Sequence, residues 1–371
     1  MTKPTISLVV IALDEELAIG RCLACFADMA DEIVVAMDNR TKDHTARIAE
    51  EFGANVVSFE WKDDFSAARN LAYSHAAMDW VVWADCDDVI TDEDREKLLM
   101  AIHEAEKDGK TSVTVPYILG TDADGTPTTE ANLKVRASRK GALTWLYRIH
   151  EVPSYDGAKD VIRRDIPVFH KKTLEKGNRD KDRNLHMLER ALAEPHEVWM
   201  KPRYLFYLAR EQRYHGMSDL ALKTYREYLP ISTWTPERHR ALIDMSGIHL
   251  DRKEYDEAAM RAFEALQLEP EWVDPYVALM WVAYHQQRWQ SVVDWATLAI
   301  MHQGKTHPLF DWTPHHTWLP HYIMAVGLWN LKRWKDGLEH ARIAKGFQPD
   351  HVQNNQNIRF FEEKIAAEAQ A

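Results

Sequence analysis

Three carboxylates follow a short apolar run and form the part of the sequence best suited to chemistry. Residues 80–84 read WVVWA, a run of β-forming residues that is typical of a strand covered on both faces. Asp85, Asp87 and Asp88 come directly after it. Ligands of open parallel sheets lie just beyond the carboxyl ends of strands, and hard divalent cations prefer carboxylate oxygens. The pattern therefore predicts a cation site. The alternative is a solvated turn before a helix cap, where Asp is also common.

The chain around this run alternates strand and helix patterns with short connections. Strands are expected at residues 6–13, 32–37, 55–59 and 80–84. Helices are expected at residues 15–29, 43–52 and 66–75, and another begins at Thr91, where Asp94 follows as a capping residue. This alternation predicts βαβ units and a mostly parallel sheet, with the acidic turn at the end of its fourth strand.

Beyond Asp108 the pattern changes to short strands separated by turn residues. These strands are expected at residues 112–118, 133–136, 143–149 and 166–169. We interpret this part as a mixed sheet that closes over the first.

From about Asn178 the strand patterns give way to amphipathic helices with internal repetition. Trp289 follows Tyr255 by 34 residues, and Trp334 occupies the same place after a further 45, the excess falling in the loop at residues 304–314. A weaker copy begins at Met217. The period, the aromatic residue, the small residues and the closing prolines resemble tetratricopeptide repeats. The alternative is a non-repetitive helical bundle.

Composition limits the class of protein. The 371 residues carry a formal charge of −12, which argues against non-specific binding to nucleic acid or anionic membrane. Three cysteines cannot build a disulfide framework, and no apolar window reaches the roughly 18 residues that a membrane span needs. We expect a cytoplasmic globular protein of two domains.

Several ordered segments resemble a known family. They are ISLVVIALDEE, DEIVVAMDNRTKDHT, FEWKDDFSAARN, WVVWADCDD, VRASRKGALTWLYRIHE and VFHKK. The chain resembles family-2 glycosyltransferases of the GT-A fold that carry C-terminal tetratricopeptide repeats, and its layout is similar to that of the peptide S-glycosyltransferases that modify bacteriocins. The resemblance implies an α/β GT-A catalytic domain over residues 1–177 and an all-α repeat domain over residues 178–371.

The resemblance implies a nucleotide-sugar site at the ends of the first strands. Asp38 is suited to accept the imide N–H of uracil, and Arg69 to clamp a phosphate through its planar fork. The alternatives are a turn residue for Asp38 and, for Arg69, a salt bridge to Asp63 or Asp64. The residues expected to bind the UDP-sugar are Leu13, Asp14, Glu15, Asp38, Arg69, Asn70 and Asp85.

A metal site and a base complete the implied machinery. Asp87 and His170 are the expected ligands of a divalent cation, Mn or Mg, although a His at a strand end is often structural. Glu151 is the expected general base, with His150 orienting it or contacting the acceptor. The alternative for Glu151 is a simple pair with Arg148 or a nearby Lys.

The implied reaction is an inverting transfer of a hexose-type sugar from a UDP-sugar, with a protein or peptide as the favoured acceptor because solenoids bind extended chains. A glycan, a lipid-linked acceptor or a nucleobase remains open. Two other classes are weaker: an inactive repeat scaffold predicts a damaged donor site, and a nucleotidyltransferase needs a Gly- and Arg/Lys-rich loop where this chain has LDEELAIGR. Nucleic acid is an unlikely partner, and the repeats allow a homodimer.

Overall fold

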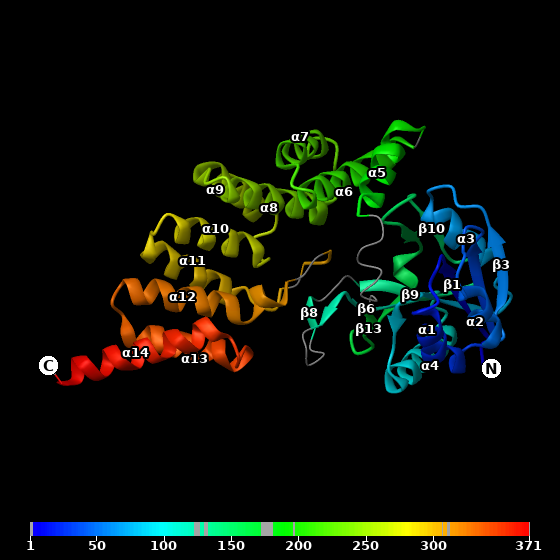
Figure 1. Cartoon of the computed structure of the whole chain (residues 1–371), viewed down its shortest axis with the longest axis horizontal. Coiled ribbons are helices and arrows are strands. Elements are labelled where there is room, and N and C mark those ends of the chain that lie inside the picture. Colours follow the sequence, from blue (N-terminus) through cyan, green and yellow to red (C-terminus); the bar gives the residue numbers. More distant parts are fainter. Residues whose placement is uncertain are drawn as a thin grey trace. The chain divides into compact units, whose positions relative to one another are not determined.

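The chain folds into two compact units, Met1–Tyr204 and Leu205–Ala371, in the computed structural model (Figure 1). The structure describes residues 3–121, 127–129, 133–171, 181–195, 197–305, 307–309 and 312–370. The domain boundary expected after residue 177 lies in the segment 172–180, outside the described residues, and it stays a prediction.

A mixed sheet forms the centre of the N-terminal unit, in the order β3-β2-β1-β4-β9-β6-β13-β5, with β12 paired to β6. β1 pairs in parallel with β2 and β4, whereas β9 runs antiparallel to β4 and β6. The strands of this sheet are β1 (Ile6–Ala12), β2 (Glu32–Asp38), β3 (Asn55–Phe59), β4 (Trp80–Asp85), β5 (Asp88–Val89), β6 (Ser112–Ile118), β9 (Leu133–Arg139), β12 (Asp160–Ile162) and β13 (Val168–His170).

The expectation of a second sheet that closes over the first is wrong. β9 pairs directly with the backbone edge of β4, so the later strands continue the same sheet. Two small hairpins lie outside it: β7 (Gly120–Thr121) with β8 (Pro127–Thr129), and β10 (Thr144–Leu146) with β11 (Val152–Ser154).

The strand expected at residues 143–149 is likewise too long. Only Thr144–Leu146 is a strand, and it pairs with Val152–Ser154. Tyr147 and His150 adopt φ values of 70° and 53°, a left-handed backbone that cannot continue a strand. The five residues between the two strands therefore form a loop, and Glu151 is its last member.

Helices cover both faces of the sheet. They are α1 (Ile19–Phe26), α2 (Thr45–Glu51), α3 (Phe65–His75) and α4 (Asp92–Lys107). The unit also contains α5 (Arg183–Ala193) and the short 3-10 turns η1 (Ala27–Met29), η2 (Gly157–Lys159) and η4 (Val198–Met200). The helix expected from residue 15 begins only at Ile19. A turn precedes it, in which the Ala18 N–H donates to the Glu15 carbonyl and the Glu15 N–H donates to Thr45 Oγ1.

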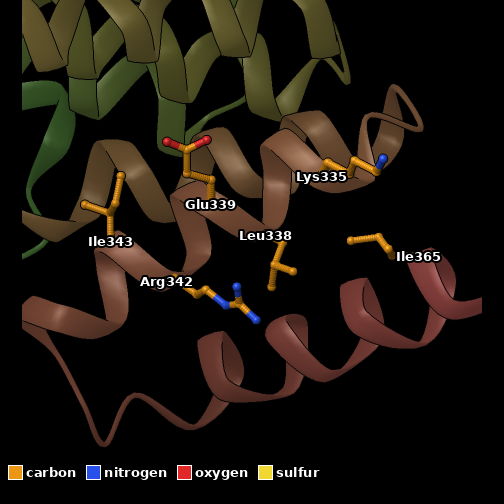
Figure 2. Close-up of a pocket in the computed structure, with 6 residues that line it drawn as sticks. All are labelled: Lys335, Leu338, Glu339, Arg342, Ile343 and Ile365. Atoms are coloured by element: carbon orange, nitrogen blue, oxygen red, sulfur yellow. The ribbon is translucent and has the colours of Figure 1, made fainter.

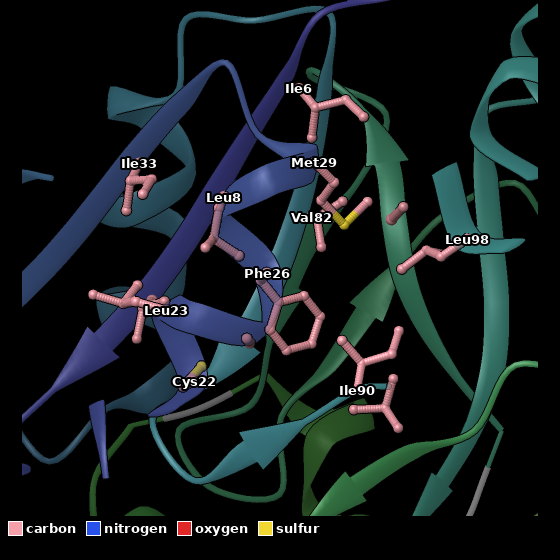
Figure 3. Packing of buried hydrophobic residues seen from close by; sticks show 14 of the residues in the cluster. Ile6, Leu8, Cys22, Leu23, Phe26, Met29, Ile33, Val82, Ile90 and Leu98 are labelled. Carbon is pink, nitrogen blue, oxygen red and sulfur yellow. The ribbon is translucent and has the colours of Figure 1, made fainter. Parts of the chain in front are cut away.

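Alternation along the strands fixes which face each side chain meets. Leu8 and Val82 face the core built with α1 and α4, where Phe26 and Leu98 are buried (Figure 3). Trp83 and its neighbours on the other face pack against α3 and β10. Because side chains alternate, Asp85 is expected on the same face as Trp83, the side of α3.

The C-terminal unit is helical. Among the described residues beyond 181, every regular element is a helix: α6 (Lys201–Tyr214), α7 (Ser218–Tyr228), α8 (Thr235–Asp251), α9 (Tyr255–Leu268), α10 (Asp274–His285), α11 (Trp289–Met301), η5 (Thr313–His316), α12 (Trp318–Asn330), α13 (Trp334–Phe347) and α14 (Val352–Gln370), besides α5 and η4 given above. No helix of the described part is long and apolar enough to span a membrane.

The predicted repeats are confirmed at the level of the helices. α9, α11 and α13 begin at the three equivalent aromatic residues. A fully buried alanine lies at the same place in each helix: Ala262, Ala296 and Ala341. Each helix is also preceded by a left-handed residue at the same place: Lys253, Gln287 and Lys332. The shared positions show one helix-pair unit used repeatedly.

The last helix pair carries an open groove of about 600 Å³ (Figure 2). Five of its lining residues come from α13, including Leu338 and Arg342, and Ile365 comes from α14.

Candidate active site

Asp85 ends β4 at the point where the order of the strands reverses. β1 is followed by β2 and β3 on one side, and β4 lies on the other. Such a switch point opens a crevice at the carboxyl ends of the strands. Asp85 lies opposite Ile11 near the end of β1, so the acidic turn opens into that crevice.

His170, which ends β13 near the far edge of the sheet, lies beside the acidic turn. β5 pairs with β13 and sets His170 opposite Asp88. His170 Nδ1 lies 3.1 Å from Asp87 Oδ1 and 3.6 Å from Asp88 Oδ1. Ligand atoms of Asp85, Asp88 and His170 all lie within 4.8 Å of one another. The structure thus brings His170 to the turn that the sequence singled out.

Asp88 has a structural partner that distinguishes it from its neighbours. Its Oδ2 accepts from Arg136 Nη1 at 2.8 Å, and both side chains are fully buried. The same oxygen accepts from the Asp85 N–H at 3.0 Å, and Oδ1 accepts from the Tyr117 hydroxyl at 2.7 Å. These donors neutralise Asp88, so it shapes the turn.

The electrostatics of the cluster favour positive charge. Burial alone would raise the pKa of the Asp85 carboxyl, but the charges of Arg69 and Lys134 hold it well below its usual range. Burial alone would lower the pKa of His170, whereas its hydrogen bonds to Asp87 and Asp88 raise it to about 9. The carboxylates attract a proton onto His170, and by the same force they would attract a divalent ion. Two carboxylates and an imidazole fit Mn²⁺ or Mg²⁺.

Arg69 lies between two acidic groups of the site. Its Nη2 donates to Asp85 Oδ1 and its Nε donates to Glu151 Oε1, both at 2.8 Å. The guanidinium stacks on Trp83 at 4.5 Å and on Trp145 at 4.9 Å from the ring centroids. The alternative partners considered from the sequence are wrong: Asp63 pairs with Arg190, and Asp64 caps α3. The prediction that Arg69 clamps a phosphate remains untested.

The loop that carries His150 and Glu151 is held from two sides. The Arg148 carbonyl accepts from the Phe65 N–H at 2.8 Å, and the Arg148 side chain pairs with Glu194. Arg203 Nε donates to the His150 carbonyl at 3.1 Å. Glu151 is therefore presented by a fixed loop, and its partner is Arg69, not the Arg148 weighed as the alternative.

Asn70 holds the hairpin that precedes this loop. Its amide nitrogen donates to the Trp145 carbonyl and its amide oxygen accepts from the Trp145 N–H, both at 2.9 Å. These bonds fix β10 against α3. Asn70 therefore supports the site by holding β10 in place, while its contact with the sugar donor stays a prediction.

A hydrogen bond joins the loops that follow β1 and β2. The Lys42 N–H donates to Asp14 Oδ1 at 2.7 Å, which ties the loop that holds Leu13, Asp14 and Glu15 to the loop after β2. Asp38 is almost fully buried, and Arg40 bonds both of its carboxylate oxygens, with Nη2 at 2.7 Å. A nucleobase that contacts Asp38 must share it with Arg40.

Lys134 belongs to the site but was missed from the sequence. Its Nζ lies 4.3 Å from the centroid of the Tyr117 ring and 5.7 Å from that of Trp83. Burial lowers its pKa, against the pull of Asp85 and Glu151. The available signal was the alternation of Lys134 and Arg136 with the apolar residues Leu133, Val135 and Ala137, since residues two apart lie on one face. Arg139, by contrast, pairs with Glu106 at the other end of β9.

Comparisons with known proteins identify similar sequences for both parts of the chain. Residues 7–166 match the family described as glycosyl transferase family 2. The SPbeta prophage-derived glycosyltransferase SunS of Bacillus subtilis is 26% identical over 263 residues, which is 68% of this chain and 60% of that protein. A TPR repeat-containing protein of Synechococcus elongatus is 43% identical over 83 residues, 22% of this chain and 20% of that protein. The chain thus spans less than two thirds of the length of either relative.

Two solved structures have partial likeness. Glucosyl-3-phosphoglycerate synthase from Mycobacterium tuberculosis, solved with Mn²⁺, UDP-glucose and phosphoglyceric acid, has 24% identity and a TM-score of 0.27 over 31% of this chain and 44% of its own. MamA from Desulfovibrio magneticus has 13% identity and a TM-score of 0.38 over 45% of this chain and 86% of its own. On its sequence match, its sheet and its repeats, the chain carries a family 2 glycosyltransferase domain of the GT-A fold, followed by a helical domain of the tetratricopeptide type.

Proposed function

We propose that this protein transfers a hexose-type sugar from a UDP-sugar to a peptide or protein side chain, with inversion and with a divalent cation. One observation carries the proposal above others: Arg69 connects Asp85 of the acidic cluster to Glu151 through bonds of 2.8 Å. This bridge supports a cation site and a carboxylate base in one crevice at the switch point of the sheet.

Asp87 and His170 would hold the cation, Mn²⁺ or Mg²⁺. When bound, such an ion supplies charge neutralisation of the diphosphate and so stabilises the nucleoside diphosphate as leaving group. Lys134 adds a positive charge beside Tyr117, on the side where Asp85 lies. Asp38, Asp14 and the neighbouring loop would hold the nucleoside.

Glu151 would take the proton of the acceptor. As the acceptor oxygen or sulfur bonds to the anomeric carbon, the bond from that carbon to the diphosphate oxygen breaks, and the proton passes to the carboxylate. One carboxylate base suffices because the leaving group needs no acid, which differs from the two carboxylates of inverting glycosidases. Arg69 bonds Oε1 of Glu151 and so orients the other oxygen, Oε2.

A peptide or protein acceptor is supported by the repeats, because stacked helix pairs provide a surface for an extended chain. A glycan, lipid-linked or nucleobase acceptor is the other outcome of an acceptor screen. An inactive scaffold is disfavoured because the acidic cluster, His170 and Glu151 are all present and connected.

Calorimetric titration of the full chain with UDP tests the donor half of the proposal. We expect binding that strengthens with Mn²⁺ and weakens in EDTA, and an Asp87→Asn variant that loses the metal effect. Asp28→Asn is the matched control, since the Asp28 side chain is 76% exposed and lies on η1. Equal affinity in Mn²⁺ and EDTA would contradict the cation assignment. Mass spectrometry with a panel of nucleotide sugars then identifies the sugar.

Pairing of two copies through the helical repeats is also part of the proposal. The groove between α13 and α14 supports it, because Ile343 exposes apolar surface there beside the charged residues Glu339 and Arg342. Light scattering after gel filtration tests it, and a monomeric mass at micromolar concentration would contradict it.

A further inference from the structure

A second pocket lies in the N-terminal unit, apart from the acidic cluster. Its volume is about 410 Å³, and its walls include Asp64, Tyr147, Arg148, Glu197 and Tyr204. The walls come from the start of α3, the loop after β10 and the segment that begins α6. None of these residues is among those expected to bind the donor.

The charges of the pocket favour a cation. Arg148 is the one guanidinium among the lining residues, and it is already paired with Glu194 at 2.5 Å. Asp64 Oδ1 caps α3 by accepting a hydrogen bond from the Ala67 N–H at 2.8 Å. Because this donor is neutral, the negative charge of the Asp64 carboxylate remains at the pocket. Glu197 adds a second, exposed carboxylate.

Most charged side chains next to the lining residues form ion pairs or hydrogen bonds with one another. Arg190 bonds Asp63 and Glu194, and Arg203 lies on Tyr147 and donates to the His150 carbonyl. The carboxylates of Asp64 and Glu197 are therefore the charges that the pocket itself presents.

Aromatic rings form the remaining wall. Tyr147 meets Tyr204 edge to face at 5.7 Å and Trp199 at 5.5 Å between centroids. Ring faces beside carboxylates suit a cation on an apolar stem, because the methylene groups pack on the rings while the charge meets the carboxylates. Lys and Arg have this chemistry.

Two chain segments connect the pocket to the proposed reaction site. On α3, Asp64 and Ser66 line the pocket and Arg69 enters the site; a helix rises 1.5 Å per residue, so about 5 Å along the axis separates Ser66 from Arg69. On the loop, Arg148 lines the pocket and Glu151 follows three residues later, a span of at most about 11 Å. An extended peptide covers this distance in about three residues.

We propose that this pocket binds a Lys or Arg side chain of the acceptor polypeptide, within about four positions of the residue that receives the sugar. The inference rests on the proposed function and adds a specificity element to it. The chain's net charge of −12 also favours encounter with basic peptides.

Synthetic 17-residue peptides, which extend eight positions on each side of the acceptor residue, test the proposal with the full chain. Each peptide has a central Ser, Thr or Cys and a single Lys moved through the other positions, with norleucine in place of Lys as the uncharged match. Binding is measured by fluorescence anisotropy without donor, and transfer by mass spectrometry with the UDP-sugar found active. We expect about tenfold tighter binding for Lys placed within four positions than for norleucine, as a cation meeting a carboxylate and a ring provides.

The variant Asp64→Asn with Glu197→Gln removes both charges while Asn keeps the capping function of residue 64. We expect this variant to bind UDP as the wild type does and to lose the preference for Lys. Asp28→Asn is the control and keeps the preference. The pocket does not recognise the acceptor if UDP binds but Lys and norleucine peptides bind with equal affinity. Survival of the preference for Lys in the double variant would lead to the same conclusion. Failure to bind any nucleotide would instead overturn the proposed function.

Discussion

Asp85 and Glu151 are bonded to the same guanidinium, that of Arg69, at 2.8 Å each. One residue belongs to the expected cation and donor site and the other is the proposed base. Arg69 thus sets the distance between the two halves of the reaction, and the rings of Trp83 and Trp145 hold the guanidinium in place.

Replacement of Glu151 by Gln should lower transfer by the 10²–10⁴ expected of a lost general base. UDP affinity should stay within a few fold, because the amide oxygen still accepts from Arg69. Steady-state transfer and calorimetry measure the two effects. Glu104→Gln, on an exposed part of α4, serves as the control. A variant that transfers sugar at the wild-type rate would exclude Glu151 and leave His150 or Asp88 as candidates.

Replacement of Arg69 by Met should destabilise the N-terminal unit by about 3–5 kcal/mol at pH 7, because two carboxylates lose a nearly buried partner. In the wild type, the depressed pKa of Asp85 adds stability that is present above about pH 4 and is lost below it. In the variant, burial raises the pKa of Asp85 instead, so protonation relieves the defect. Urea unfolding should show the difference between the two proteins shrinking from pH 7 to pH 4, and a constant difference would contradict this account.

Replacement of Lys134 by Met should weaken UDP binding about tenfold, the effect of one charge-assisted contact. Lys134→Arg should retain most of the affinity because it keeps the charge. Lys140→Met, after the end of β9, is a matched control because it removes an exposed lysine from the same segment. Equal losses in the Met and Arg variants would indicate a packing role instead.

His239 should make the helical unit sensitive to mild acid. Burial lowers the pKa of His239 to about 3, with His307 and Arg240 acting in the same direction and Asp274 opposing them. The unfolded chain, with a pKa of about 6.5, takes up this proton first, so the free energy of unfolding falls as the pH drops below 6.5 and is unaffected above it. The loss attributable to His239 is about 2 kcal/mol at pH 5.

The variant His239→Phe should fill the same space beside Trp272 and lose less stability between pH 7 and pH 5. Thermal unfolding at both pH values measures this. His321, whose pKa is lowered to about 4 by burial, retains its own dependence of similar size in both proteins. An unchanged pH dependence in the variant would show that His239 does not titrate in this way.

Replacement of Ala262 by Leu should destabilise the repeats by about 1–3 kcal/mol, because the alanine is fully buried where the helix pair packs. Gln267→Leu adds an apolar side chain at an exposed position of the same helix and should change stability little. Thermal unfolding compares them. Similar effects of the two changes would argue that the helices are not closely packed at Ala262.

Sequence periodicity predicted much of the fold because the first strands are continuous apolar runs. β3 and β6 begin and end where expected, and the helices of the repeats begin at their aromatic residues. The strand around Trp145 was predicted too long because its apolar residues continue past Tyr147, where the backbone turns. The positive φ of a tyrosine cannot be recognised from the sequence.

Local sequence also predicted which residues gather at the site, but not how they pair. His170 and Asp88 meet through the pairing of β13 with β5, a strand of two residues that no periodicity can reveal. Arg69 could not be assigned to Asp85 and Glu151 because Asp63 and Asp64 lie closer along the chain. Partners distant in sequence depend on the packing of whole elements, which spacing alone does not contain.

The buried pair of Asp88 and Arg136 has a consequence for synthesis of the chain. The two residues are 48 positions apart, and Asp88 is fully enclosed once folded. In a nascent chain that has not yet released β9 from the ribosome, Arg69 is available to Asp85, but the Asp88 carboxylate lacks its guanidinium partner. We therefore expect β1 to β4 to dock early and the turn to stay unformed until translation passes Arg139, so that protease resistance of the turn appears only in ribosome-bound chains longer than this. The cation site would then be among the last parts of the N-terminal unit to be made.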